Sequence, residues 1–311
     1  MEKYSLEAIE RIAAAPRASY DTISVDPITP IIGAEIGGVD IARPIPDKQL
    51  AELRSAFLEY HVLVFRDQHI SPEDHKRFAG YFGELKRLPI SDIDGGDPVI
   101  LEVKASKESR FVAGEAWHTD GTAEAAPSLG SMLYVTQIPE LGTGGDTMFA
   151  NMHLAYDMLS PDMKRFVEGL TAIHDGLIPW QGYTPPPELH IPKSEHPLVV
   201  RHPETGRKLL YVNSGFTSHI VQLSQFESRC VLDMLFRMIE REPILNCRIR
   251  WTNNTLVFWD NRCTQHHAVW DYYPWSRYGQ RISINGTRPT ADLPAHEKRP
   301  AQDEQPRPVP A

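Results

Sequence analysis

The sequence predicts a mainly β protein with helical buttresses, of the β-sandwich or jelly-roll kind. Short apolar segments of strand length recur along most of the chain, and each is bounded by Gly, Pro or other turn residues. Helical patterns are confined to the start of the chain and to two later insertions. Strands and helices do not alternate regularly, which argues against a doubly wound fold.

The bulk composition is that of a soluble globular protein. The chain has 311 residues, of which 41% are hydrophobic and 23% charged, so it can bury a substantial core. The net charge of -9 and the lack of a long basic block argue against a nucleic-acid partner. No apolar run approaches the roughly 18 residues of a membrane span, and the N-terminus has no signal-peptide core.

The three cysteines are Cys230, Cys247 and Cys263, and they are widely spaced. This spacing fits neither a disulfide framework nor a zinc-ligand motif. We therefore expect free thiols in a reducing, cytoplasmic compartment. Each cysteine is expected to be a small buried hydrophobe.

In the first third of the chain, the local patterns predict three helices and several strands. The helix over 47–60 has apolar residues at helical spacing. Ser71 is expected to cap the next helix, because Pro72 takes its first position and Asp74 lies three residues after the cap. The expected elements are a helix over 6–15, strands over 22–28 and 31–41, a helix over 47–60, a strand over 61–65, a helix over 71–82 and a strand over 99–103.

In the rest of the chain, strands predominate. The Gly-rich turn at 142–147 is not a P-loop, because no Lys-Ser/Thr pair follows the glycines. The Pro-rich, aromatic segment 175–195 is expected to be a lid, a binding loop or a disordered loop. The other expected elements are strands over 129–135, 197–201, 208–213, 247–251, 255–259 and 281–286, and helices over 151–159, 160–170 and 224–241.

The stretch Trp117-His118-Thr119-Asp120 carries the first candidate site. His118 and Asp120 are two residues apart, so on a strand both side chains point to one face. An imidazole and a carboxylate so placed are two-thirds of the 2-His-1-carboxylate triad of non-haem Fe(II) oxygenases. A capped turn at Asp120-Gly121 is the alternative reading of this stretch.

A second candidate group follows the apolar strand over 255–259. If the chain continues as a strand, one of His266 and His267 faces inward and the other outward. Arg277 and Arg281 are four residues apart, so they share a strand face, and an inward Arg needs an anionic partner such as a carboxylate. A hydrogen-bonded core histidine and surface salt bridges are the alternatives.

Several stretches together resemble the taurine dioxygenase (TauD/TfdA-like) family of Fe(II)- and 2-oxoglutarate-dependent dioxygenases. The similarity runs from about residue 23 to 289. The matching stretches are Trp117-His118-Thr119-Asp120, Gly144-Gly145-Asp146-Thr147, the segment 202–208, Tyr211-Val212-Asn213 and the segment 259–266, followed by Arg277 and Arg281 at the family's spacing.

This resemblance implies a double-stranded β-helix, a form of jelly roll, with a defined set of site residues. His118, Asp120 and His266 would bind Fe(II), and His266 rather than His267 fits the family's Thr-Gln-His motif. Thr147 and Arg277 would bind the distal carboxylate of 2-oxoglutarate. O2 is the other co-substrate, and succinate and CO2 are the co-products. Related halogenases lack the carboxylate, so its presence here favours hydroxylation.

The composition of the chain and the resemblance together predict its organisation and its partners. Residues 1–20 form a helix and arm, residues 21–289 the dioxygenase domain with a lid insertion at about 175–196, and residues 290–311 a disordered tail. Arg281 lies where taurine enzymes hold the anionic group of the substrate. The partner is a small molecule, without nucleic acid or membrane, and the family commonly forms homodimers or homotetramers.

The chain departs from taurine enzymes at substrate contacts. Leu88 and Ser91 stand where those enzymes have a His and a Tyr, and Gly114 stands in place of an Asn. We therefore expect taurine to be a poor substrate. Trp180 in the lid suggests a larger, more apolar substrate, although ordinary packing explains it equally well.

The segment 112–120 looks closer to the phenoxyalkanoate and alkylsulfatase branches. An aryloxy or alkyl acid, a sulfate ester and a secondary metabolite are the substrates that remain open. Desaturation, epoxidation or ring expansion with the same cofactors is one alternative to hydroxylation. A non-catalytic jelly-roll protein that binds metal or ligand is another, disfavoured because the expected iron and 2-oxoglutarate residues are all present.

Overall fold

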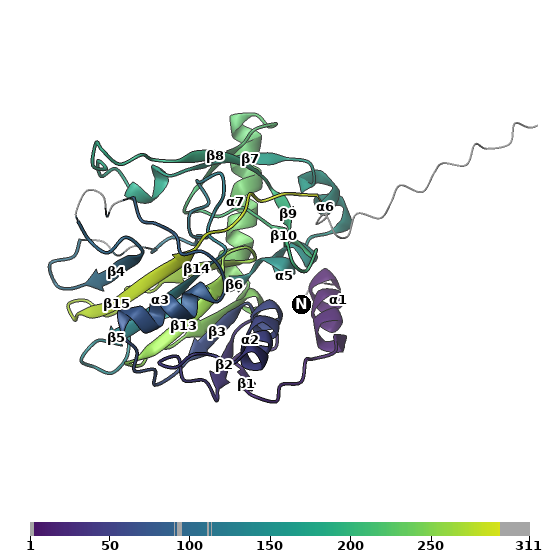
Figure 1. Cartoon of the computed structure of the whole chain (residues 1–311). Coiled ribbons are helices and arrows are strands. Elements are labelled where there is room, and N and C mark those ends of the chain that lie inside the picture. Colours follow the sequence, from purple (N-terminus) through teal and green to yellow (C-terminus); the bar gives the residue numbers. More distant parts are fainter. Residues whose placement is uncertain (1–2, 90, 92–94, 111, 113, 293–311) are drawn as a thin grey trace, which may run out of the picture.

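The fold is a pair of β-sheets that face each other, with helices on the outside (Figure 1). The computed structural model describes residues 3–292, except 90, 92–94, 111 and 113. Strands pair antiparallel, apart from the parallel pair β2 and β3. The major sheet has the order β1 (Ser24–Pro27), β2 (Ala34–Gly37), β3 (Val62–Phe65), β13 (Thr255–Asp260), β5 (Gly130–Gln137), β15 (Arg277–Ile284), β4 (Ile100–Ala105). The minor sheet has the order β12 (Asn246–Ile249), β6 (Thr147–Asn151), β14 (Thr264–Ala268).

Strand β13 is buried on both faces, which explains its unbroken apolar sequence. Val257 and Trp259 pack in the core between the two sheets. Leu256 and Phe258 pack on the opposite face, in the core under α2 (Asp47–Tyr60) and α3 (Pro72–Gly80). The rings of Phe258 and Phe57 of α2 stack with centroids 3.9 Å apart. The major sheet is therefore the central layer of the molecule.

The second half of the chain adds a separate helical core. It is built on α7 (Gln225–Arg241), and α1 (Lys3–Ala14), α5 (Met152–Asp157) and α6 (Pro161–Val167) contribute to it.

The start of α3 is capped by two side chains. The Ser71 hydroxyl accepts a hydrogen bond from the Asp74 N–H, and the Asp74 carboxylate accepts one from the Ser71 N–H. This capping box confirms the predicted start of α3.

Two small sheets complete the structure. The strands are β11 (Thr217–Ile220), β7 (Thr171–Asp175) and β8 (Lys193–Pro197) in one sheet, and β10 (Lys208–Leu210) and β9 (Val199–Arg201) in the other. The loop between β7 and β8 contains the 3₁₀ helix η1 (Ile178–Trp180), and a second, η2 (Pro243–Leu245), precedes β12. Residues 171–175 and 193–197, parts of which were expected to be loop, therefore form strands.

The predicted fold class is confirmed, and α2 has the predicted bounds. Strands β6, β7, β8 and β11 were not predicted. Cys247 and Cys263 are free and buried as expected, but the prediction for Cys230 is wrong, because α7 presents it on its exposed face. Residues 293–311 of the expected disordered tail lie outside the described residues. Thr290, the first residue of that tail, is described, and its carbonyl accepts a hydrogen bond from the Arg201 N–H.

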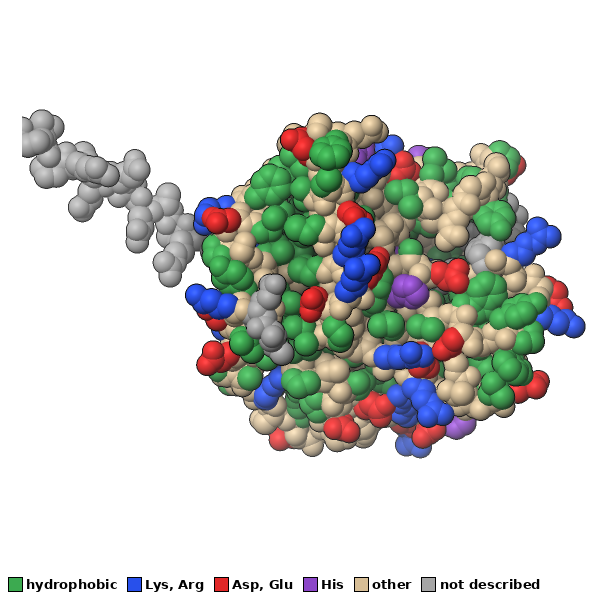
Figure 2. All heavy atoms as spheres, turned by 180° about the vertical axis from the view of Figure 1, so that it is seen from behind, with side chains coloured by type: hydrophobic (Ala, Val, Ile, Leu, Met, Phe, Trp, Pro, Cys, Tyr) green, Lys and Arg blue, Asp and Glu red, His purple; other side chains and the backbone are tan. Residues whose placement is uncertain are grey.

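The face of the molecule opposite to the one seen in Figure 1 carries charged and hydrophobic side chains mixed together. Figure 2 shows basic and acidic side chains interspersed with hydrophobic ones over this face. Within the part of the chain that the structure describes, no helix combines the length and apolarity needed to cross a bilayer.

Candidate active site

The three predicted iron ligands converge between the two sheets. His118 and His266 form an isolated β-bridge, in which each backbone N–H donates to the carbonyl of the other, at 3.0 and 2.8 Å. The Nε2 atoms of His118 and His266 lie 3.7 and 3.9 Å from Asp120 Oδ1. One potential ligand atom from each residue lies within 4.8 Å of the others. The bridge thus brings a residue near the middle of the chain beside one far downstream.

Both imidazoles are prepared to act as neutral ligands. His118 Nδ1 lies 2.8 Å from the Ala116 carbonyl, so it carries the proton and leaves the Nε2 lone pair facing Asp120. Burial lowers the pKa of His118, and lowers that of His266 well below its ordinary value. Two neutral imidazoles and a carboxylate are the donor set of a non-haem Fe(II) centre, so these residues fit that metal.

The Asp120 carboxylate is held from two sides. Burial alone would raise its pKa, but the Arg281 guanidinium, helped by the Ser131 hydrogen bond, reverses this and holds the pKa of Asp120 below its ordinary range. The Ser131 hydroxyl donates to Oδ2 at 2.8 Å, and Arg281 Nη1 donates to Oδ1 at 2.7 Å. Asn261 donates to Ser131 and accepts from the Trp259 indole. The carboxylate is therefore ionised and fixed in orientation.

Two glycines allow the chain to approach His118 closely. A Cβ on Gly215 would lie 2.8 Å from the His118 Cβ. Gly114 has a φ of +93°, and a Cβ there would lie 3.0 Å from the His118 Cε1. A larger residue at either position would displace the imidazole, so Gly114 serves the metal site as well as lining the cavity.

Arg277 is a buried cation beside the triad. Its side chain is 5% exposed, and its Nε and Nη2 atoms have no hydrogen-bond partner among the described residues. Burial lowers the pKa of Arg277. Its guanidinium carbon lies 5.1 Å from the ring centroid of Trp251, whose indole N–H donates to Thr147 Oγ1 at 3.1 Å. A buried guanidinium with free donors is suited to an anionic ligand.

Trp251 was not singled out from the sequence, although it links Thr147 and Arg277. Its position just before a buried strand gave no signal beyond ordinary packing. Ser131, which holds the Asp120 carboxylate, was missed as well, because a serine in an apolar strand has no distinctive spacing.

A cavity of about 450 Å³ joins these groups. His118, His266, Thr147, Arg277 and Arg281 all line it, as does Gly114. Much of the remaining wall is apolar and includes Leu101, Val103, Val112, Leu133, Trp259 and Tyr272. A concave, largely apolar space with a few convergent polar groups is the usual form of a small-molecule site.

Three predicted substrate contacts are not among the described residues that line this cavity. The Ser91 hydroxyl donates a hydrogen bond to the Leu88 carbonyl at 2.7 Å. Trp180 is half-buried in η1. The roles of these three residues in substrate binding stay predictions.

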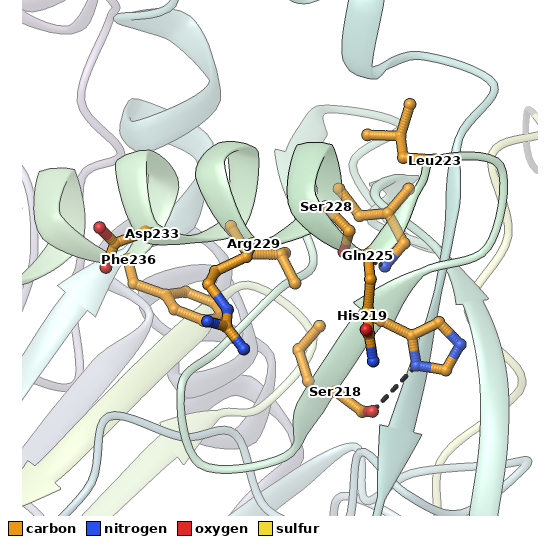
Figure 3. Close-up of a pocket in the computed structure, with 11 residues that line it drawn as sticks. Ser218, His219, Leu223, Gln225, Ser228, Arg229, Asp233 and Phe236 are labelled. Carbon is orange, nitrogen blue, oxygen red and sulfur yellow. Dashed lines mark hydrogen bonds between the residues drawn. The ribbon is translucent and has the colours of Figure 1, made fainter.

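A second cavity, of about 490 Å³, lies elsewhere, between β11 and α7 (Figure 3). Ser218 and His219 of β11 face it, together with Arg229 and Asp233 of α7. None of the predicted site residues lines it. His118, His266, Thr147, Arg277 and Arg281 therefore line the cavity between the sheets and not this one.

Comparison with known proteins identifies relatives over most of the chain. The family model "Taurine catabolism dioxygenase TauD, TfdA family" matches residues 24–283. An alkylsulfatase of Acinetobacter baylyi is 35% identical over 83% of this chain and 84% of its own. The alpha-ketoglutarate-dependent 2,4-dichlorophenoxyacetate dioxygenase of Cupriavidus pinatubonensis is 30% identical over 79% of this chain and 92% of its own.

A solved structure, that of a taurine dioxygenase from Burkholderia xenovorans, superposes with a TM-score of 0.76. It is 34% identical and covers 87% of this chain and 92% of its own. The family uses Fe(II), 2-oxoglutarate and O2, and acts on small molecules. The chain therefore belongs to the TauD, TfdA family and is a 2-oxoglutarate-dependent dioxygenase.

Proposed function

We propose that this enzyme hydroxylates an unactivated C–H bond of a small to medium-sized, fairly apolar anion, an alkyl sulfate ester or an aryloxy acid. The observation that carries the proposal is the cavity between the sheets. Much of its wall is apolar, yet Arg277, Arg281 and the two histidines of the triad, His118 and His266, line it. A ligand atom of Asp120 lies within 4.8 Å of those of both histidines. Such a wall favours an alkyl or aryl body, and the arginines favour anionic groups.

The three ligands of the iron are His118, Asp120 and His266. Bound Fe(II) supplies O2 activation coupled to oxidative decarboxylation of 2-oxoglutarate, which gives succinate and CO2. Three protein ligands leave open positions for the co-substrates. The Ala116 carbonyl and Ser131 fix the orientation of two of the ligands. The protein thus holds the donor set ready before the metal binds.

Arg277 and Thr147 bind the distal carboxylate of 2-oxoglutarate. The guanidinium has two unpaired N–H positions in a buried setting, where a carboxylate binds strongly. Because Thr147 Oγ1 accepts from Trp251, its own proton is available to donate to the carboxylate. Both residues line the cavity, so both can reach a ligand there.

Arg281 faces the anionic group of the substrate while it also supports Asp120. Its Nη1 is engaged by Asp120, and its Nε has no hydrogen-bond partner among the described residues. Its side chain is 25% exposed and borders the cavity. The guanidinium can therefore donate to a sulfate or carboxylate without leaving Asp120. Taurine is expected to be a poor substrate, because Gly114 offers its ammonium no side-chain acceptor and much of the cavity wall is apolar.

A succinate-release screen tests this function. The purified enzyme, loaded with Fe(II) under 2-oxoglutarate and O2, is offered medium-chain alkyl sulfates, 2,4-dichlorophenoxyacetate and taurine in parallel. We expect at least one alkyl sulfate or aryloxy acid to release succinate faster than taurine does, with one oxygen gained in the initial organic product. Preference for taurine would overturn the substrate class. A product that loses two hydrogens instead would indicate desaturation.

Two further expectations belong with this proposal. The family resemblance implies a homodimer or homotetramer, which light scattering on the purified protein measures directly. The free, buried thiols of Cys247 and Cys263 support a cytoplasmic location, which fractionation of cells that make the protein would test.

A further inference from the structure

A second group of side chains of metal-ligating types lies outside the His-Asp-His triad. His61, His153 and Cys263 come from distant parts of the chain, and one potential ligand atom of each lies within 4.8 Å of the others. Their exposed fractions are 2%, 1% and 1%. His61 follows α2, His153 lies in α5, and Cys263 lies between β13 and β14.

The two imidazoles in this cluster have buried nitrogen atoms that lack a partner. His153 Nδ1 donates to the Lys208 carbonyl at 2.9 Å, which leaves Nε2 without its proton. His153 Nε2 and His61 Nδ1 have no hydrogen-bond partner among the described residues. Burying a polar atom without a partner is unfavourable. Because these two nitrogen atoms are buried in the same cluster, one ligand bound between them would satisfy both.

Both imidazoles are neutral near pH 7, which is the form that binds metal. Burial, with a contribution from Arg207, lowers the pKa of His61 to about 3. The same two causes lower the pKa of His153 well below its ordinary value. Protonation therefore does not compete for the free lone pairs.

We propose that His61, His153 and Cys263 form a second, structural metal site for a thiophilic cation, Zn²⁺ or Cu⁺. One sulfur and two imidazole nitrogens are a soft to borderline donor set, unlike the oxygen ligands that Mg²⁺ and Ca²⁺ prefer. On binding, the Cys263 S–H bond breaks, the sulfur bonds the cation, and the proton leaves to solvent, with no change of oxidation state.

The neighbouring Asp260 supplies charge instead of a ligand atom. Arg262 Nε and Nη2 donate to its two oxygens at 2.8 and 2.7 Å, and His202 Nε2 lies 3.0 Å from Oδ2. These bonds occupy the carboxylate and keep it fully buried. Its negative charge near His61 and Cys263 partly offsets that of an incoming cation. Burial and this same charge raise the pKa of the Cys263 thiol, so the cation itself has to displace the proton.

The site would connect three elements around the active site. Cys263 lies three residues before His266, and its carbonyl accepts from the Met152 N–H at the start of α5. A bound cation would therefore fix the junction of α2 and β3 to α5 and to the start of β14. Because a metal that binds only the folded state stabilises it, we expect a higher melting temperature with the cation bound.

Cobalt spectroscopy of the full-length protein separates this site from the iron triad. Co²⁺ bound to Cys263 gives a thiolate-to-metal charge-transfer band in the near ultraviolet, whereas the triad contains no sulfur. We expect wild type to develop this band and to bind two equivalents of Co²⁺. His266→Ala should keep the band and lose one equivalent. Titration with Zn²⁺ and Cu⁺, followed by metal analysis, then decides which cation binds more tightly.

Matched variants test the named ligands. Cys263→Ser and His153→Phe should abolish the band, whereas Cys247→Ser and His75→Phe, which alter buried residues outside the cluster, should keep it. A wild-type protein that binds one equivalent without a charge-transfer band would overturn the proposal, whether or not the variants fold. Survival of the band in Cys263→Ser would do the same.

Discussion

Arg281 Nη1 lies 2.7 Å from Asp120 Oδ1, the same oxygen that faces the Nε2 atoms of both histidines. One guanidinium therefore supports the metal-binding carboxylate while it borders the cavity. Arg281 was expected from the sequence as a substrate contact, and its bond to Asp120 was not foreseen. Under the proposed function, this one residue would both orient Asp120 and bind the anionic group of the substrate.

Replacing Arg281 should weaken the binding of the substrate more than the binding of 2-oxoglutarate. Arg281→Met removes one charged partner of the substrate anion, and a charge-assisted hydrogen bond contributes about 1.5–3 kcal/mol. We expect KM for the anionic substrate to rise by roughly 10- to 100-fold. The Kd of 2-oxoglutarate should change little when variant and wild type are loaded to the same iron content, a control needed because Asp120 also loses its Arg281 partner. Steady-state kinetics on the substrate found in the screen, with Arg281→Lys for comparison, measures this. An unchanged KM would remove Arg281 from substrate binding.

Arg277→Met should weaken the binding of 2-oxoglutarate and leave the binding of iron unchanged. The variant removes the buried cation that we propose binds the distal carboxylate of the co-substrate; Arg277 is 5% exposed, and its Nε and Nη2 have no partner among the described residues. Loss of about 2 kcal/mol or more corresponds to at least a roughly 30-fold rise in the Kd. Anaerobic titration of the Fe(II) protein with 2-oxoglutarate provides the value, and metal analysis provides the control. Equal affinities in variant and wild type would refute this role.

Trp251→Phe should have a smaller effect in the same direction. The variant keeps a ring under Arg277 but loses the N–H that orients Thr147 Oγ1. A neutral hydrogen bond contributes about 1 kcal/mol, so the Kd of 2-oxoglutarate should rise by roughly fivefold. Trp251→Leu, which also removes the ring, should raise it further. If both variants bind 2-oxoglutarate with the wild-type Kd, Trp251 is only a packing residue.

His75→Phe should reduce the loss of stability in acid. Burial lowers the pKa of His75 to about 3 from 6.5. Between these values the unfolded chain binds the proton and the folded chain does not, so stability present above pH 6.5 is lost as pH falls. One proton corresponds to about 1.4 kcal/mol per pH unit. Urea unfolding between pH 7 and 4 should show a shallower slope for the variant, and parallel slopes would contradict this.

Local patterns predicted the class of fold, and spacing predicted His118 and Asp120 as a candidate pair, whereas His266 as the third ligand came from the family resemblance. His118 and Asp120 lie two residues apart, and the strand that carries His266 faces them as expected. The strand β7 was missed because His174 occupies a buried position that an apolar residue would normally mark. Leu88 lies in an irregular segment and Trp180 in the short 3₁₀ helix η1 of a long loop, and the path of both segments depends on tertiary contacts that no local pattern encodes.

The most direct test is the visible charge-transfer band of the Fe(II)–2-oxoglutarate chelate under anaerobic conditions. We predict that wild type shows this band and that His266→Ala loses both the band and bound iron. His267→Ala, which changes the adjacent imidazole, should retain both. A wild-type protein without the band, or a His266→Ala variant that keeps it, would contradict the assignment of His118, Asp120 and His266 as the iron site.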